Sequence, residues 1–280
     1  MIGLDPDPAR LLAQAVDAAA EGTAAERAGR AVAFHCRALI DAVAPVCVAV
    51  KLQLACFECL GAPGWRALEE TATAARAAGL FVIADGKRGD VPHTAAVYAQ
   101  AAFGGTETPW GRVAGLGADA VTANPMLGRD ALEPLVEAAR AAQGAVFVLV
   151  RTSNPGAGAL QDAESGGAPW HERVARMVDE LGASSPTGLS DVGAVVGATQ
   201  PALVERLREL MPRAPFLLPG IGAQGGRVDE LRPAFAAGPA GALVTASRSL
   251  VEPALEVDDA GAAREAAERL REQTWALSAQ

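Results

Sequence analysis

The chain has 280 residues, of which 50% are hydrophobic, with a formal net charge of −9 at pH 7 and a pI near 4.9. The acidic balance argues against a general nucleic-acid surface, and no apolar run is long enough to span a membrane. The N-terminus has no basic stretch followed by a long apolar one, so we expect a cytoplasmic protein without a signal peptide. No linker divides the chain, and we expect a single domain over residues 1–280.

Short apolar, β-branched segments alternate with Ala-rich amphipathic segments along the chain. Eight strands are predicted, at Ile2–Asp5, Val46–Leu52, Leu80–Asp85, Asp119–Asn124, Ala145–Arg151, Val192–Ala198, Pro215–Pro219 and Gly241–Ala246. Eight helices are predicted, at Ala24–Val43, Gly64–Ala78, His93–Phe103, Asp130–Ala142, Trp170–Leu181, Pro201–Leu210, Arg227–Ala236 and Ala262–Leu277. This alternation favours a parallel α/β sheet, and eight units in roughly 250 residues are typical of a (β/α)₈ TIM barrel. The rival is a doubly wound open sheet, which rarely needs eight evenly spaced units.

Several predicted strands end in polar residues. Lys51 and Asp85 end the second and third strands, and Ser153 follows the fifth. Active sites of (β/α)₈ barrels lie at the C-terminal ends of the strands, so we expect the site there. Two long loops, 104–117 and 154–169, are placed to cover it.

Lysine is scarce: of the 24 Lys and Arg residues only Lys51 and Lys87 are lysines. A lysine ammonium can give up its proton whereas arginine cannot, which suggests that chemistry retained these two. In an extended chain Asp85 and Lys87 point to one face, with Lys51 on the preceding strand and Asp90 three residues further on. Alternating charges keep one another ionised, which suits a lysine that donates a proton and suits a Schiff-base lysine poorly. The alternative is a surface network of salt bridges.

A glycine-rich segment, Pro219–Gly226, follows the seventh predicted strand, and Ser247-Arg248 follows the eighth. Backbone N–H groups of such loops and a helix N-terminus bind phosphate in many of these barrels. Arg248 can add two parallel hydrogen bonds to a phosphate. The segment also matches G-x-G-x-x-G, but no acidic residue ends a strand about 20 residues later, so a dinucleotide site is poorly supported. Simple turns are the other interpretation.

Other motifs carry weaker signals. Cys56 and Cys59 form a lone C-x-x-C without a second pair, and the three histidines are scattered, so no zinc site is predicted. In the run Arg151–Gly156, hydroxyl and amide groups at a strand end can bind a polar heterocycle, although a turn with a helix cap explains the run better.

The ordered set of motifs resembles orotidine 5′-phosphate decarboxylase of the longer bacterial form, the type 2 subfamily. A strand-end Lys51 precedes D-x-K-x-x-D at Asp85–Asp90, and P-G-I-G-x-Q-G-G and a late Ser-Arg follow. Further matching runs are Gly3–Pro8, Val50–Gln53, Asn124–Gly128, Arg151–Ala157 and Gly193–Thr199. The chain departs from the pattern at Leu52, where proline is expected, at Met126, where tyrosine is expected, and before Ser247, where a second serine is usual. None of these departures removes a charged catalytic residue.

The resemblance implies decarboxylation of orotidine 5′-monophosphate to uridine 5′-monophosphate in de novo pyrimidine biosynthesis, without a metal or organic cofactor. Lys87 would protonate C6, Asp85 would lie against the substrate carboxylate, Lys51 would link the acidic residues and the ribose, and Asp90 would cross into the partner's site of a homodimer. The implied substrate-binding residues are Asp5, Thr94, Ser153, Pro219, Gln224, Gly225 and Arg248. Two alternatives stay open: a metal-dependent sugar-phosphate synthase or aldolase of the same barrel suprafamily, and a non-catalytic phosphate-binding barrel.

Overall fold

A computed structural model describes residues 1–183, 185–222 and 225–278. The chain divides into two compact units, Met1–Gly86 with Ala246–Glu272 and Lys87–Thr245 with Gln273–Gln280. Each unit consists of two separate segments of the chain, and strand β3 (Phe81–Arg88) begins in the first unit and ends in the second.

The first unit contains parallel strands at its centre. Strand β1 (Ile2–Leu4) pairs with β2 (Ala49–Gln53), and β2 pairs with β3. Ile2 also forms a parallel bridge with Ala246. The helices of this unit are α1 (Ala13–Asp17), α2 (Ala24–Val43), α3 (Leu54–Glu58), α4 (Ala62–Ala77), α10 (Arg248–Val257) and most of α11 (Gly261–Ser278).

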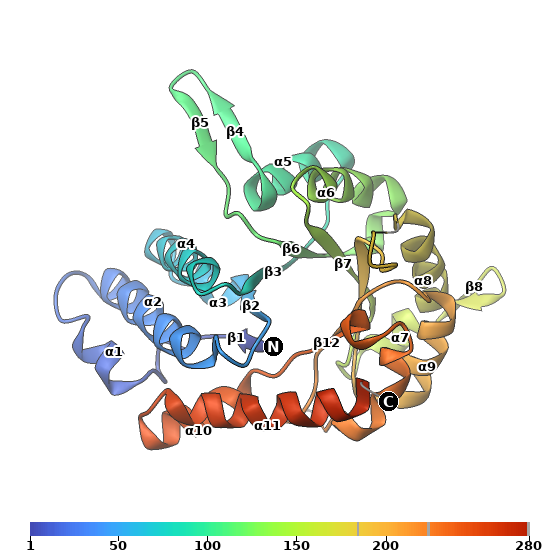
Figure 1. Cartoon of the computed structure of the whole chain (residues 1–280). Helices are drawn as coiled ribbons and strands as arrows, with labels where there is room; N and C mark the ends of the chain where they lie inside the picture. The colour runs from blue at the N-terminus through green and yellow to red at the C-terminus, as the bar shows by residue number, and fades with distance from the viewer. Residues whose placement is uncertain (184, 223–224, 279–280) are drawn as a thin grey trace. The chain divides into compact units, whose positions relative to one another are not determined.

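Helix α2 shows how the sequence specifies these elements. Thr23 and Glu26 form a capping box, in which each side chain accepts a hydrogen bond from the other residue's backbone N–H. Val32, Cys36 and Leu39 recur at helical spacing and are fully buried. Helix α4 packs along α2, and the two lie side by side in Figure 1.

The second unit contains five further parallel strands in the order β6 (Ala120–Ala123), β7 (Ala145–Arg151), β10 (Val192–Val196), β11 (Phe216–Leu218) and β12 (Ala242–Val244). Its helices are α5 (Pro92–Phe103), α6 (Arg129–Ala141), α7 (Ala157–Gln161), α8 (Trp170–Leu181) and α9 (Pro201–Leu210). Short 3₁₀ turns are η1 (Pro125–Leu127), η2 (Val228–Glu230), η3 (Arg232–Phe235) and η4 (Pro239–Gly241).

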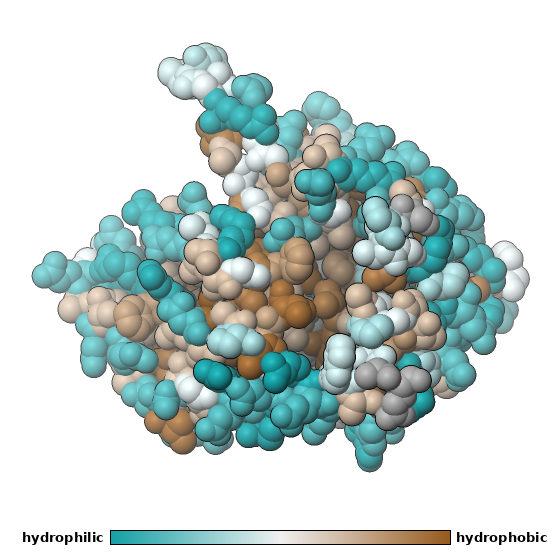
Figure 2. Space-filling view, in the orientation of Figure 1, coloured by the Kyte–Doolittle hydropathy of each residue, from teal (hydrophilic) through white to brown (hydrophobic). Residues whose placement is uncertain are grey.

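Two antiparallel hairpins interrupt this unit: β4 (Gly105–Thr108) with β5 (Gly111–Ala114), and β8 (Glu164–Ser165) with β9 (Ala168–Pro169). The β4–β5 hairpin projects away from helix α5 in Figure 1, and Figure 2 shows it standing out as a narrow arm. Trp110 in its turn is 92% exposed. The hairpins and α7 occupy the two segments predicted as long loops.

The strand order β1-β2-β3-β6-β7-β10-β11-β12, parallel throughout and separated by helices, is the order of a (β/α)₈ barrel and confirms the predicted fold class. All five residues of β10 are buried, as is typical of a strand covered on both faces. In the described residues, no helix is both long and apolar enough to cross a membrane.

Two local predictions were wrong. The helix predicted over Arg227–Ala236 is instead the pair of 3₁₀ turns η2 and η3, and Pro233 in the second turn lacks the N–H that an α-helix would use there. Helix α10 was not predicted, and Pro253 lies in its interior.

Candidate active site

The centre of the site in the first unit is a buried ion cluster around Lys51. The Lys51 ammonium lies 2.6 Å from a carboxylate oxygen of Asp85 and 3.6 Å from one of Asp5. Gln53 donates a longer hydrogen bond, 3.4 Å, to the same Asp85 oxygen. Lys51 is 6% exposed and Asp85 is 4% exposed, so this pair is shielded from water, whereas Asp5 reaches the surface.

Opposing effects act on the charge of Lys51. Burial is the largest and would lower the pKa, but the carboxylates of Asp85 and Asp5 more than offset it and raise the pKa above 10.5. Lys51 therefore stays an ammonium at neutral pH.

Parallel register brings these residues together. Gly3 of β1 lies opposite Lys51 of β2, and Gln53 at the end of β2 lies opposite Asp85 of β3. Asp5 follows the last residue of β1, so its carboxylate comes from the same C-terminal edge. Gly3 has a second role, because a Cβ there would lie 2.0 Å from the hydroxyl oxygen of Ser247. A side chain at position 3 would therefore force the Ser247 hydroxyl to move.

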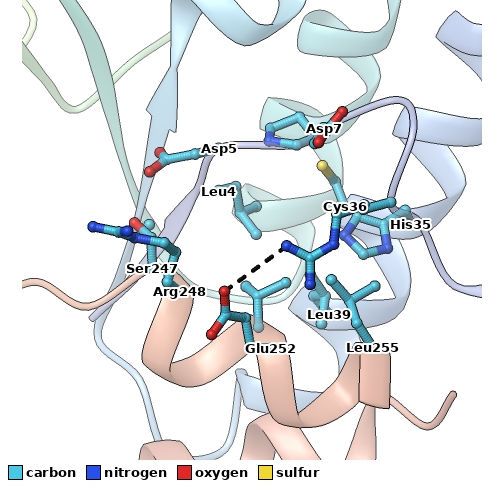
Figure 3. A pocket seen from close by; sticks show the side chains of 14 residues that line it. Leu4, Asp5, Asp7, His35, Cys36, Leu39, Ser247, Arg248, Glu252 and Leu255 are labelled. Carbon is cyan, nitrogen blue, oxygen red and sulfur yellow. Dashed lines mark ion pairs between the residues drawn. The ribbon is translucent and has the colours of Figure 1, made fainter. Parts of the chain in front are cut away.

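A pocket of about 280 Å³ lies beside this cluster within the first unit. Asp5, Ser247 and Arg248 lie along one side of it, as Figure 3 shows. Arg248 is the first residue of α10, so its guanidinium adds to the favourable dipole of a helix N-terminus. This combination suits an anion. Across the pocket, Arg10 and Glu252 form a 3.9 Å ion pair, drawn as the dashed line in Figure 3.

The chain after Asp5 is fixed by hydrogen bonds to two helices. The Leu12 N–H donates to Nδ1 of His35 on α2 at 3.3 Å, and the Ala13 N–H donates to Asp258 at the end of α10 at 2.7 Å. His35 is 2% exposed, and burial lowers its pKa to about 4. A neutral imidazole is what this contact needs, because Nδ1 must accept the hydrogen bond of the Leu12 N–H.

The remaining predicted residues lie in the second unit. Lys87 has a left-handed backbone, φ +49°, and its N–H donates to the Thr122 hydroxyl at 2.9 Å. The expectation that Asp85 and Lys87 share a face assumed an extended chain at both, and the structure departs from it at Lys87. Asp90 accepts a hydrogen bond from the Val91 N–H at 2.8 Å just before α5, and Thr94 lies in the first turn of that helix.

A polar network fixes the chain around Ser153. The Arg151 guanidinium forms two parallel hydrogen bonds with Asp162, at 2.8 and 2.9 Å. The Thr152 N–H donates to Gln161 at 2.8 Å, and the Gln161 amide returns a hydrogen bond to the Thr152 hydroxyl at 2.9 Å. Ser153 is half-buried between these anchors.

The glycine-rich segment forms a closed turn after β11. The Gly225 N–H donates to the Gly222 carbonyl at 2.8 Å, and the Gly226 N–H donates to the Gly220 carbonyl at 3.0 Å. Pro219 directly follows β11. Gln224, predicted to bind phosphate, lies outside the described residues.

The structure thus brings Lys51, Asp85 and Asp5 together and places Arg248 on the pocket that Asp5 lines. Sequence reasoning missed Thr122 and His35, which act through backbone contacts and carry no motif. Gln161 and Asp162 were also missed, and their only signal was a polar pair within a segment predicted to be a loop. Among the described residues, no group of three or more His, Cys, Asp or Glu side chains is arranged to hold a metal ion.

Comparison with known proteins decides the family. The model of the orotidine 5′-phosphate decarboxylase / HUMPS family matches residues 3–273. The chain belongs to this family. An orotidine 5′-phosphate decarboxylase of Deinococcus radiodurans is 49% identical over 238 residues, covering 84% of this chain and 82% of the relative. The enzyme of that name from Rhodopirellula baltica is 44% identical over 255 residues, covering 89% and 82%.

A solved family structure agrees with this assignment. The Leishmania donovani OMP decarboxylase superposes with a TM-score of 0.76 at 33% identity, covering all of this chain and 93% of that one. These named relatives are decarboxylases, so the sugar-phosphate synthase or aldolase alternative is not favoured.

Proposed function

We propose that this protein decarboxylates orotidine 5′-monophosphate to uridine 5′-monophosphate and CO₂, with Lys87 as the proton donor. Membership of the orotidine 5′-phosphate decarboxylase family supports the reaction. The observation that carries the mechanism is the buried Lys51–Asp85 pair, with Lys87 two residues further along β3. The pair fixes a carboxylate in a dry environment, where charge interactions are strong.

One proposed group for the ribose, Asp5, and one for the phosphate, Arg248, lie within the first unit. Asp5, 39% exposed at its side chain, can accept hydrogen bonds from ribose hydroxyls. Arg248 and the N-terminus of α10 would bind the phosphate, with Pro219, Gln224 and Gly225 as its proposed partners from the glycine-rich turn. Phosphate and ribose do not change during the reaction, so their binding energy can hold the pyrimidine in an unfavourable position.

That unfavourable position is beside Asp85. The Lys51 ammonium favours the carboxylate form of Asp85, and a substrate carboxylate placed against it would meet a like charge; this repulsion would be relieved when CO₂ leaves. The bond between C6 and the carboxylate carbon breaks, and its electron pair stays on C6. A proton from the Lys87 ammonium then forms the new C6–H bond, and the lysine regains a proton from solvent. Ser153, fixed by the Arg151–Asp162 network, would orient the pyrimidine.

We also propose a homodimer with shared sites, in which Asp90 and Thr94 reach the partner's substrate. In support, both residues adjoin apolar groups that face solvent in the single chain: Val91 and Val97 are each 53% exposed and Tyr98 is 37% exposed. Mixing inactive Lys87→Ala and Asp90→Ala proteins tests the idea, because hybrid dimers would regain one intact site. No recovery after subunit exchange would contradict the shared site.

Replacing Lys87 tests the proposed mechanism. Lys87→Ala removes the proton donor, and Lys87→Arg keeps the charge but does not deprotonate. Both variants should lose nearly all decarboxylation, followed as the change in pyrimidine absorbance, with an unchanged circular dichroism spectrum. Wild-type rates in Lys87→Ala would contradict the assignment. The single domain over residues 1–280 and the cytoplasmic location stay predictions.

A further inference from the structure

The backbone of Lys87 is held in a conformation that a lysine rarely adopts. Its φ of +49° lies in the left-handed region, where a side chain crowds the backbone and glycine is favoured. In the described parts of the chain, only Gln143 and Asp258 are other non-glycine residues with positive φ. Strained backbone at a functional residue persists only where neighbouring groups determine it.

Those neighbouring groups come from strand β6 of the same unit. The Thr122 hydroxyl accepts the hydrogen bond of the Lys87 N–H at 2.9 Å, and Thr122 is 2% exposed. Two residues further, the Asn124 N–H donates to the Arg88 carbonyl at 2.8 Å. Gly89 lies so close to β6 that a Cβ on it would be 2.8 Å from the Asn124 carbonyl oxygen. The end of β6 thus supports the chain from Lys87 to Gly89.

The contact with Thr122 differs from an ordinary sheet contact. In a parallel ladder a backbone N–H donates to a backbone carbonyl of the next strand. At Lys87 a side-chain hydroxyl takes that position, so the N–H has an acceptor although the backbone of Lys87 is left-handed within β3. Without the hydroxyl, the N–H would lose this acceptor, and a half-buried contact that fixes the left-handed backbone of Lys87 would be absent.

We propose that Thr122 is a positioning residue for the reaction: its hydroxyl selects the left-handed backbone of Lys87 and thereby aims the ammonium at C6. The proposal rests on the role assigned to Lys87 above. In this proposal Thr122 does not contact the reacting atoms and acts only through the backbone of Lys87. Loss of the hydroxyl should therefore slow the chemical step and leave substrate binding largely intact.

Two matched variants separate the hydroxyl from the shape of the side chain. Thr122→Val keeps the β-branched shape and removes the acceptor, whereas Thr122→Ser keeps the acceptor and removes a methyl group. A misplacement of about 1 Å can cost about 100-fold in rate, so we expect kcat of the valine variant to fall by about 10- to 100-fold. We expect KM of the valine variant to change by less than about 3-fold, because the groups that bind the substrate are unchanged. The serine variant should keep both kcat and KM within about 3-fold of wild type.

The experiment measures kcat and KM of wild type, Thr122→Val, Thr122→Ser and Lys87→Ala by the same absorbance assay, with circular dichroism to establish folding. A valine variant as active as wild type, or a serine variant as slow as valine, would overturn the role of Thr122. If the valine variant does not fold, Thr122→Ala is compared with Thr122→Ser. Equal rates of these two variants would also overturn the role of Thr122. An active Lys87→Ala would instead overturn the proposed role of the lysine itself, so the two failures are distinguishable.

Discussion

Replacing Lys51 with methionine should destabilise the protein strongly. Methionine fills similar space but leaves the buried Asp85 carboxylate without its ammonium partner. Two unit charges 2.6 Å apart attract by roughly 6 kcal/mol at an effective dielectric constant of about 20. Part of that attraction is offset by the desolvation of both groups, and breaking a buried pair from one side typically costs about 3–5 kcal/mol.

A double variant supplies the matched control. Lys51→Met combined with Asp85→Asn removes both buried charges, and replacing a whole buried pair is often neutral. We therefore expect the double variant to recover most of the stability lost in Lys51→Met, with a coupling energy of about 2 kcal/mol or more. Neither variant should decarboxylate orotidine 5′-monophosphate, because Asp85 and its partner are part of the proposed site.

Urea unfolding followed by circular dichroism, at one protein concentration, measures these differences. The reasoning is refuted if Lys51→Met loses less than about 1 kcal/mol, or if the double variant is no more stable than the single one. Either result would mean that the pair is solvated rather than buried in solution.

Four further predictions follow from the same structure. Because the pKa of Lys51 is raised above 10.5, its contribution to stability is complete below pH 10.5 and is lost as the pH rises through the raised value. The difference in unfolding free energy between wild type and Lys51→Met, measured in urea, should therefore shrink at high pH. A constant difference would contradict this prediction. The pKa of His35 is lowered from 6.5 to about 4, so the unfolded chain takes up a proton at higher pH than the folded one. About 3 kcal/mol of stability should therefore be lost as the pH falls from 6.5 to 4. His35→Gln should lose less stability over this range in thermal unfolding, and an equal loss would refute the role of His35. Asp162→Asn should raise KM by weakening the anchor of Arg151 beside Ser153, and an unchanged KM would exclude that role. Calorimetry should record a single unfolding transition, as expected for one domain, and two separated transitions would disprove it.

Much of the fold could be predicted because it depends on patterns repeated along the chain. Six of the eight barrel strands fall within predicted segments, and β2 and β3 extend beyond theirs. Helices α2, α8 and α9 have the predicted bounds, since periodic apolar residues determine such elements. The predicted helix over Arg227–Ala236 contains Pro233, and the chain forms the 3₁₀ turns η2 and η3 there instead. Helix α10 was not among the predicted helices, and it continues through Pro253, a residue with low intrinsic helix propensity.

The site was predicted only in part, because the sequence shows charged side chains at strand ends but not contacts to the backbone. Charged residues at strand ends, such as Lys51 and Asp85, are visible in the sequence, and their proximity follows from parallel register. Contacts to the backbone are not visible in this way. Nothing in the sequence indicates that the Thr122 hydroxyl accepts the Lys87 N–H, or that Lys87 leaves the extended conformation, because both depend on how β6 lies against the end of β3.

The most direct test of the central claim is the absorbance of orotidine 5′-monophosphate after addition of the purified protein, with Lys87→Ala as the control. We predict that wild type converts the substrate absorbance to that of uridine 5′-monophosphate without an added metal or organic cofactor, and that Lys87→Ala leaves it constant. A wild-type protein that produces no change, or a Lys87→Ala variant that matches it, would contradict the account.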